Sequence, residues 1–231
     1  MIDVIPSASR HFQDIGWLKT YWLFSFDNYF DPNNVGFGSL RVFNDDVVEP
    51  GRGFDRHRHR EMEIVSIIHS GAIHHEDSMG NRERIKAGEV QVMSAGSGVK
   101  HSEYNLEDKE LHLYQIWLMP NQSDLKPSYD QKDFSKVDKS NRLLAVASGR
   151  NVNEALYINS DATLYLGNLE KGKTLEQEID KNAKCFIYLT IGKLSINGTE
   201  LSASDQARIE NETRLELSAV DNTNFVLMDL Y

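Results

Sequence analysis

Apolar and polar residues alternate in short runs along most of the first half of the chain. These runs are rich in β-branched and aromatic residues and are bounded by Gly, Pro or Asn, as half-buried β-strands are. No stretch before residue 120 shows a sustained apolar period of about 3.6 residues, which would indicate a helix. Regularly spaced strands separated by turns are typical of a sandwich or barrel. The pattern predicts strands at 41–48, 61–70, 89–94 and 111–119, with a turn at 77–81.

The second half of the chain repeats this organisation after a polar interruption. Residues 120–141 contain two of the five prolines and few apolar side chains, which predicts a linker or an exposed arm. Short apolar runs follow to residue 231, and Asn197-Gly198 predicts a tight hairpin turn. We therefore expect a second, divergent copy of the same barrel. The expected domains are a first barrel at 1–125, a linker or arm at 126–142 and a second barrel at 143–231.

Composition and charge argue against several classes of function. The net charge of −10 would repel phosphate backbones, and the arginines at 56, 58 and 60 interleave with histidines and acids, which indicates ion pairs or solvated strand faces. No apolar stretch approaches the roughly 18 residues of a membrane span, and the first residues lack the pattern of a secretory signal. Cys185 is the single cysteine and cannot form an internal disulfide. We expect a cytoplasmic protein without nucleic-acid or membrane partners.

Histidines supply the candidate chemistry, and all eight lie within the first 112 residues. Any histidine-based metal site therefore belongs to the first barrel. In His57-x-His59, side chains two apart on a strand point to the same face, so both imidazoles can bind one ion. His101-x-Glu103 places an imidazole and a carboxylate together in the same way. Three imidazoles and one carboxylate suit a first-row divalent ion such as Fe²⁺, Mn²⁺, Co²⁺, Ni²⁺, Cu²⁺ or Zn²⁺.

Strand parity alone does not choose the carboxylate ligand. If one strand continued beyond His59, Glu61 and Glu63 would share its histidine face, so Glu63 competes with Glu103. Cys185, in an apolar run, is expected in the core, and His11 could line the mouth of a pocket. The other histidines are expected to be surface or hydrogen-bonded residues: His69, His74, His75 and His112. An aromatic cluster could wall a substrate site, but a packed core is the favoured interpretation: Trp17, Trp22, Phe24, Phe26, Tyr29 and Phe30.

The spacing of glycines around these histidines resembles the two cupin motifs. Gly51 precedes His57 by six residues, and Gly71 follows Glu63 by eight. One extra residue before Gly71, Ser94 in place of the usual proline and two extra residues before His101 are departures that match the pirin branch. From Gly16 to about Phe134 the chain is similar to bacterial pirin-like proteins, and the C-terminal half fits them loosely. The runs that carry this resemblance are GWLKTYWLFSFDNYFDP, VGFGSLRVFNDDVVEPGRGFDRHRHREMEI, DSMGN, MSAGSGVKHSEYN and QIWLMP.

The resemblance implies an all-β fold of two tandem cupin (jelly-roll) β-barrels, a bicupin. It implies one divalent metal ion, for which we favour Fe²⁺, held by His57, His59, His101 and Glu103, with Glu63 in a supporting or pocket position. The general cupin pattern would instead make Glu63 the ligand. Glu103 is then also the expected catalytic residue, because it could accept a proton from the substrate as a general base.

The activity that the resemblance implies is that of a quercetin 2,3-dioxygenase. Such an enzyme opens the heterocycle of a flavonol with O₂ and releases carbon monoxide, and the substrate here is expected to be a flavonol or another phenolic compound. The main alternative is a regulatory module that binds other proteins and responds to its metal or redox state. A third is a purely structural ion in a small-molecule-binding barrel. A pocket that reaches the metal site would favour catalysis. The expected oligomeric state is a monomer.

Overall fold

The computed structural model describes residues 1–231 and consists almost entirely of antiparallel β-strands. Its sole helical segment is the 3₁₀ turn η1 (Ser7–Ser9). No helix is long and apolar enough to cross a membrane. The chain divides into two compact units. We call them the N-terminal unit, formed by His11–Lys136 with Leu156–Ser160, and the C-terminal unit, formed by Met1–Arg10, Val137–Ala155 and Asp161–Tyr231.

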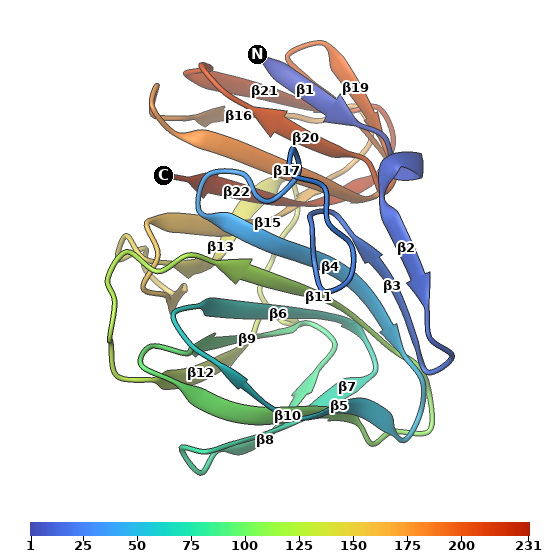
Figure 1. The fold of residues 1–231 in the computed structure, drawn as a ribbon. Helices are drawn as coiled ribbons and strands as arrows, with labels where there is room; N and C mark the ends of the chain where they lie inside the picture. The colour runs from blue at the N-terminus through green and yellow to red at the C-terminus, as the bar shows by residue number, and fades with distance from the viewer. The chain divides into compact units, whose positions relative to one another are not determined.

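The N-terminal unit is built from two antiparallel sheets (Figure 1). One has the strand order β12-β9-β6-β11-β4-β3-β2, and the other has the order β5-β10-β7-β8. The strands are β2 (His11–Asp14), β3 (Leu18–Trp22), β4 (Leu40–Val48), β5 (Arg52–His59), β6 (Glu63–Ser70), β7 (Ala72–Asp77), β8 (Arg82–Lys86), β9 (Glu89–Ser94), β10 (Val99–Asn105), β11 (Leu111–Leu118) and β12 (Ser128–Asp133); β14 (Leu156–Tyr157) also falls in this unit.

The two sheets of the N-terminal unit pack face to face. Ile68 on β6 and Leu113 on β11 belong to the same buried cluster as Ile73 on β7 and Ile85 on β8, so this core draws side chains from both sheets. A core shared by the inner faces of two sheets is typical of a sandwich-like barrel. The four strands predicted at 41–48, 61–70, 89–94 and 111–119 are confirmed with small shifts at their ends, and the turn at 77–81 is confirmed between β7 and β8.

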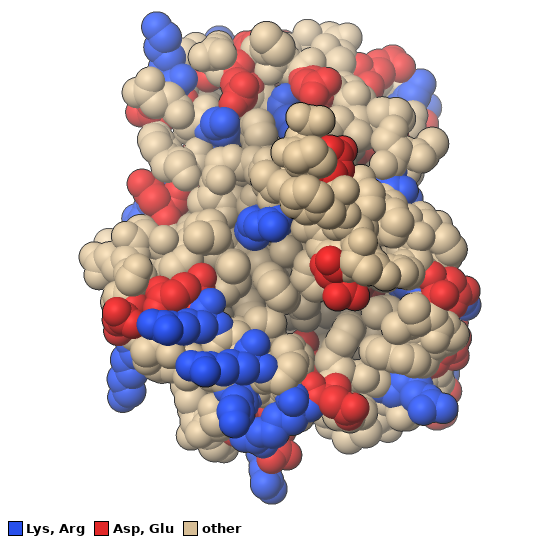
Figure 2. Space-filling view, in the orientation of Figure 1, with Lys and Arg blue, Asp and Glu red and all other residues tan.

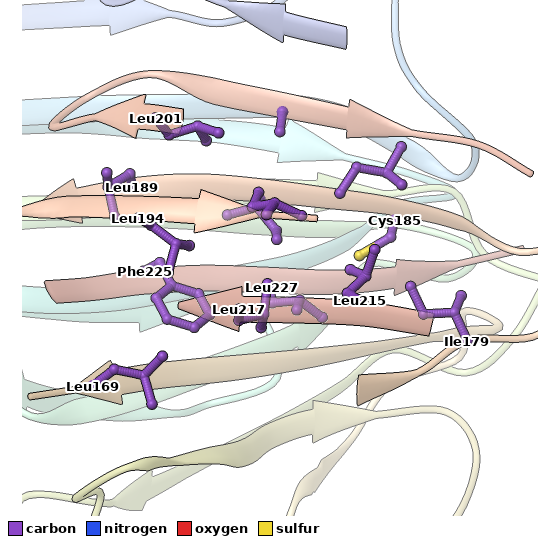
Figure 3. Close-up of a cluster of buried hydrophobic side chains, with 14 of the residues drawn as sticks. Leu169, Ile179, Cys185, Leu189, Leu194, Leu201, Leu215, Leu217, Phe225 and Leu227 are labelled. Atoms are coloured by element: carbon purple, nitrogen blue, oxygen red, sulfur yellow. The ribbon is translucent and has the colours of Figure 1, made fainter. Parts of the chain in front are cut away.

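The C-terminal unit repeats the two-sheet plan. One sheet has the order β1-β20-β17-β22-β15-β13, and the other has the order β16-β21-β18-β19. Figure 3 shows the leucines of its buried core, with Cys185 among them as expected. The strands are β1 (Ile2–Ile5), β13 (Arg142–Ser148), β15 (Ala162–Leu169), β16 (Thr174–Glu178), β17 (Lys184–Ile191), β18 (Lys193–Ile196), β19 (Thr199–Ser202), β20 (Gln206–Ile209), β21 (Arg214–Ala219) and β22 (Thr223–Leu230).

The Asn197-Gly198 hairpin turn is confirmed between β18 and β19. Asn197 has a φ of 48° and Gly198 a φ of 83°, and β18 pairs with β19 on either side of them. Two successive residues with positive φ make the turn whose twist matches that of the flanking strands. Asn and Gly adopt this backbone conformation at low cost, which is why the dipeptide is so clear a signal.

The division of the chain differs from the expected domains in three places. Leu156–Ser160 belongs to the N-terminal unit, although it falls within the expected second barrel at 143–231. Met1–Arg10 belongs to the C-terminal unit, because β1 pairs with β20 and Ile2 and Val4 pack against its core. The expected linker or arm at 126–142 contains a regular strand, β12, which pairs with β9 along its whole length. Backbone pairing with an existing sheet edge orders a segment whose polar side chains alone would indicate a loop.

Arginines in and beside the four-stranded sheet form ion pairs or are exposed, as expected. Arg56 lies 3.9 Å from Glu76, and Arg58 is exposed. Arg84 lies 2.8 Å from Glu107, and Arg60 lies 3.0 Å from Asp124. Figure 2 shows Lys and Arg gathered where β8 and β10 lie in Figure 1, with acidic groups among them. These side chains are largely exposed, so each pair contributes little to stability.

Candidate metal centre

Three imidazoles meet between the two sheets of the N-terminal unit. His57 and His59 lie on β5, and β5 pairs with β10 so that His57 stands opposite His101. The Nε2 atom of His57 lies 2.8 Å from Nε2 of His59 and 3.0 Å from Nε2 of His101. One nitrogen from each ring thus points to a common position, and the structure brings together the three histidines that the sequence singled out.

The protonation state of these rings favours metal binding. His57 donates a hydrogen bond from Nδ1 to the carbonyl oxygen of Asp55 at 2.7 Å, which leaves a lone pair on its Nε2. Burial, together with the neighbouring imidazoles, lowers the pKa of His59 to about 3. Burial lowers the pKa of His101 to about 4. Neutral imidazole is the form that binds a metal ion.

A hydrogen-bond network within the protein does not account well for this cluster. Two imidazole nitrogens approach the same lone pair of His57 Nε2, and that atom can accept from one of them in good geometry. A single cation, by contrast, accepts a lone pair from all three nitrogens at once. The donor set therefore fits a first-row divalent ion.

Glu103 lies beside this cluster, on the other side of the His101 ring. Its Oε1 atom is 3.8 Å from Nδ1 of His101, and it forms a second compact group with His101 and His75. The pairing of β10 with β5 is irregular here because β5 holds an extra residue, whereas β10 pairs regularly with β7, so His101 and Glu103 keep the same face of β10 as their two-residue spacing predicts. The three imidazoles therefore converge through their Nε2 atoms, whereas the Glu103 carboxylate lies nearest to the Nδ1 atom of His101.

The carboxylate of Glu103 is fully buried and held by donors from two strands. Gln91 on β9 donates to Oε1 at 2.8 Å, and Gln115 on β11 donates to Oε2 at 3.0 Å. Burial opposes ionisation, but the hydrogen bond with His75 and the nearby His101 outweigh it and lower the pKa of Glu103 to about 2. Glu103 is therefore a carboxylate at neutral pH, able to accept a hydrogen bond or a proton.

His75 lies beside Glu103 in the site, although the sequence reasoning did not single it out. It is buried and links two acids, with Nδ1 3.5 Å from Glu103 Oε1 and Nε2 3.2 Å from Asp77 Oδ2. Burial lowers its pKa, but Glu103 and Asp77 outweigh that and raise it. The expectation that His75 is hydrogen-bonded holds. Its place in the site depends on β7 pairing with β10, which puts His75 opposite Glu103.

A pocket of about 470 Å³ opens next to the imidazoles. His57 and His59 form part of its lining, and Trp17, Trp22 and Phe26 form much of its apolar wall. Packing and pocket lining coexist here, because Trp22 is buried and Trp17 packs against the core cluster that contains Leu113. Phe24 is fully buried, as the packed-core interpretation expects, and Phe30 is exposed. Trp22 is the last residue of β3, and Trp17 and Phe26 lie in the segments before and after that strand.

Glu63 takes no part in the metal cluster or the pocket. Its carboxylate accepts hydrogen bonds from Ser94 Oγ at 2.7 Å and from the backbone of Asn159 at 2.9 Å. The parity argument fails here because β5 ends at His59, and Glu61 has a φ of 51° in the turn before β6. The turn resets which face each residue occupies, so the expected supporting or pocket position of Glu63 was wrong.

The remaining four histidines lie outside the cluster. His69 packs against the ring of Tyr114 and its Nε2 is buried without a hydrogen-bond partner, so the expectation of a surface or hydrogen-bonded residue was wrong for it. His11 stacks on Trp22 and Tyr29 and does not line the pocket. His74 and His112 pair with acids, at 3.0 Å from Glu107 and 2.7 Å from Asp45. The expectation that these two are hydrogen-bonded residues is confirmed.

Comparisons with known proteins agree with this architecture. The Pirin family model matches residues 6–118, and the model of the quercetinase C-terminal cupin domain matches residues 145–230. A pirin-like protein of Caulobacter vibrioides is 40% identical over 230 residues, which cover 99% of each chain. Quercetin 2,3-dioxygenase of Escherichia coli K12 is 40% identical over 231 residues, which cover 100% of this chain and 99% of the relative.

A solved structure shows the same fold throughout. The bacterial pirin YhhW of Escherichia coli, in complex with nickel(II), superposes with a TM-score of 0.95 at 38% identity, over 100% of this chain and 99% of that one. The expected all-β fold of two tandem cupin barrels is thereby confirmed. With relatives this similar along the whole chain, the protein belongs to the pirin family.

Proposed function

We propose that this protein is a metal-dependent dioxygenase that cleaves a flavonol such as quercetin with O₂. The observation that carries the proposal is the convergence of three imidazole Nε2 atoms at the wall of an aromatic pocket. A catalyst needs such access, whereas a structural ion or a regulatory switch does not. The name of the Escherichia coli relative, quercetin 2,3-dioxygenase, supports the same activity.

The metal ligands that we propose are His57, His59, His101 and Glu103, with Fe²⁺ as the favoured ion. The nickel(II) complex of the related pirin supports a first-row divalent ion without selecting iron. Such an ion, when bound, supplies Lewis acidity toward an enol hydroxyl and a site for chemistry with O₂.

The protein's own groups have separate tasks in this proposal. Trp17, Trp22 and Phe26 would hold the aromatic rings and keep water from the reacting end. Glu103 would accept the enol proton at Oε2, the oxygen that faces the pocket residue Gln115. Gln115 would keep that carboxylate in one orientation by its hydrogen bond, as positioned donors do.

Turnover of quercetin under air tests the proposal. Loss of flavonol absorbance and release of carbon monoxide are measured for protein loaded with each candidate ion, in the wild type and in Glu103→Gln. We expect metal-dependent turnover that falls at least ~100-fold in Glu103→Gln, since proton transfer contributes on that order. Glu107→Gln is the matched control, because Glu107 pairs with Arg84 and His74 outside the pocket. Full activity in Glu103→Gln would refute the role of Glu103, and no turnover with any ion would refute the dioxygenase.

The cytoplasmic location and the monomeric state expected from the sequence stay predictions. The free, buried thiol of Cys185 is compatible with a reducing compartment. Cell fractionation and sedimentation velocity test the two expectations separately.

A further inference from the structure

A row of polar side chains crosses the pocket on the seven-stranded sheet, away from the strands that carry the histidines. Gln13 on β2 stands opposite Thr20 on β3, and Thr20 stands opposite Asp46 on β4. Directly opposed residues of antiparallel strands point to the same face. Asn44 lies two residues before Asp46 and so shares that face. We call these four residues the polar wall, and all of them line the pocket.

The polar wall continues from the metal centre. Asn44 stands opposite Gln115, and Gln115 donates to Glu103. Asp46, Thr20 and Gln13 form the next row, roughly 7 Å further along the strands and roughly 10 Å across. A ligand with one end at the imidazoles would therefore meet this row with its other end.

Three oxygen atoms of the polar wall, one each on Gln13, Asn44 and Asp46, are buried and have no hydrogen-bond partner in the protein. Asp46 is 2% exposed and Asn44 is 3% exposed, yet Asp46 Oδ1 and Asn44 Oδ1 accept no hydrogen bond. Gln13 Oε1 is likewise buried without a partner. Leaving buried acceptors unsatisfied costs free energy, and such groups are rare in native proteins outside binding sites.

The chemistry of the wall selects the class of ligand. The amide oxygens of Gln13 and Asn44 and the ionised carboxylate of Asp46 accept hydrogen bonds and do not donate, so a ligand that satisfies them presents donors. The neighbouring walls are aromatic, with Trp17, Trp22 and Phe54 in the lining, so the donors belong on a ring. Burial raises the pKa of Asp46 to about 7, so a hydroxyl donor would stabilise the ionised form of a carboxyl that is otherwise poorly solvated.

We propose that the polar wall binds the hydroxyl groups of a phenolic ring, with Asp46 as the acceptor that selects ligands carrying them. This assignment rests on the proposed function, which sets the orientation of the ligand. The enol of a flavonol then lies at the imidazoles and its pendant ring lies at the polar wall. Asp46 is a specificity-determining residue in this arrangement, separate from the metal ligands.

A pair of flavonols tests the wall. Quercetin carries two adjacent hydroxyls on its pendant ring, galangin carries none, and both have the same enol and carbonyl for the ion. The ratio of their dissociation constants thus isolates the pendant ring. Binding to the nickel-loaded, full-length protein is followed without O₂, so that turnover cannot interfere. All three tryptophans line this pocket, so quenching of their fluorescence reports binding there.

We expect the wild type to bind quercetin about tenfold or more tightly than galangin, as a hydrogen bond to a charged acceptor allows. Asp46→Asn preserves shape and should bring the ratio close to one, while galangin affinity stays unchanged. Thr20→Val, which removes a hydroxyl at constant shape, should reduce the ratio less. Asp130→Asn, on an exposed part of β12, is the control and should leave the ratio unchanged.

The outcomes separate this inference from the proposed activity. An unchanged ratio in Asp46→Asn would overturn the assignment of the wall even if quercetin is turned over. A ratio that depends on Asp46 would support the wall even if no turnover occurs and the dioxygenase is refuted. Failure of both flavonols to bind the wild type would overturn the inference.

Discussion

Asp46→Asn should also reveal how much free energy the buried carboxyl costs the folded protein. Burial raises the pKa of Asp46 from 3.8 to about 7, helped by Asp45 and Glu103 and opposed by the hydroxyl of Thr20 and by His112. Between these two values the folded protein holds a proton that the unfolded chain has released. The free energy of unfolding therefore falls as the pH rises between the two values, because the carboxyl ionises more easily in the unfolded chain. The contribution of Asp46 to stability is fully present at low pH and is lost as the pH rises to about 7.

The magnitude follows from the two pKa values. Linkage predicts that this group lowers the free energy of unfolding by roughly 2 to 3 kcal/mol between about pH 5 and about pH 8. Asparagine has nearly the shape of protonated aspartate and does not titrate. The stability of Asp46→Asn relative to the wild type should therefore increase by that amount over the same range of pH, whatever the other groups contribute.

Urea unfolding followed by tryptophan fluorescence measures the effect. Trp17, Trp22 and Trp117 all lie in the N-terminal unit, so the signal reports the unit that contains Asp46. Asp130→Asn is the control, because its exposed carboxylate stays in water on folding. A stability difference between Asp46→Asn and the wild type that does not change with pH would refute the argument that burial governs this carboxyl.

Three further predictions concern the metal centre and the core. His57→Ala should abolish stoichiometric Ni²⁺ binding in calorimetry, whereas His112→Ala should retain it; equal binding by both would contradict the assigned cluster. Gln115→Leu removes the donor to Glu103 Oε2 and should lower quercetin turnover about tenfold with metal content unchanged, and an undiminished rate would argue against that contact. Leu113→Ala should cost about 2 to 5 kcal/mol in urea unfolding because the residue is fully buried, while exposed Leu106→Ala should change stability by less than about 0.5 kcal/mol.

The sequence by itself was enough for the features that depend on local geometry. Alternation of side chains located the strands, because successive residues of a strand face opposite sides whatever packs against them. Asn197-Gly198 located its hairpin, because the backbone conformation of that turn favours those two residues. His57-x-His59 and His101-x-Glu103 could be recognised as pairs that face one way for the same reason. The resemblance to pirins added the expected fold and the choice of Glu103 over Glu63.

The tertiary structure decided everything that depends on which strands become neighbours. Sequence parity placed Glu63 with the histidines, but the turn at Glu61 reset the faces and sent its carboxylate to Ser94 and Asn159. The partners of Glu103 come from β7, β9 and β11, so no spacing within β10 could reveal them.

The polar wall has the same origin. Its residues come from three strands separated by loops of different length, and they form one surface because hydrogen bonding between strands sets the register. A strand pattern shows that a side chain points inward, but inward can mean a packed core or an open pocket. That difference depends on how far apart the two sheets stand at each point, which is a property of the assembled side chains and is not encoded in any short stretch of sequence.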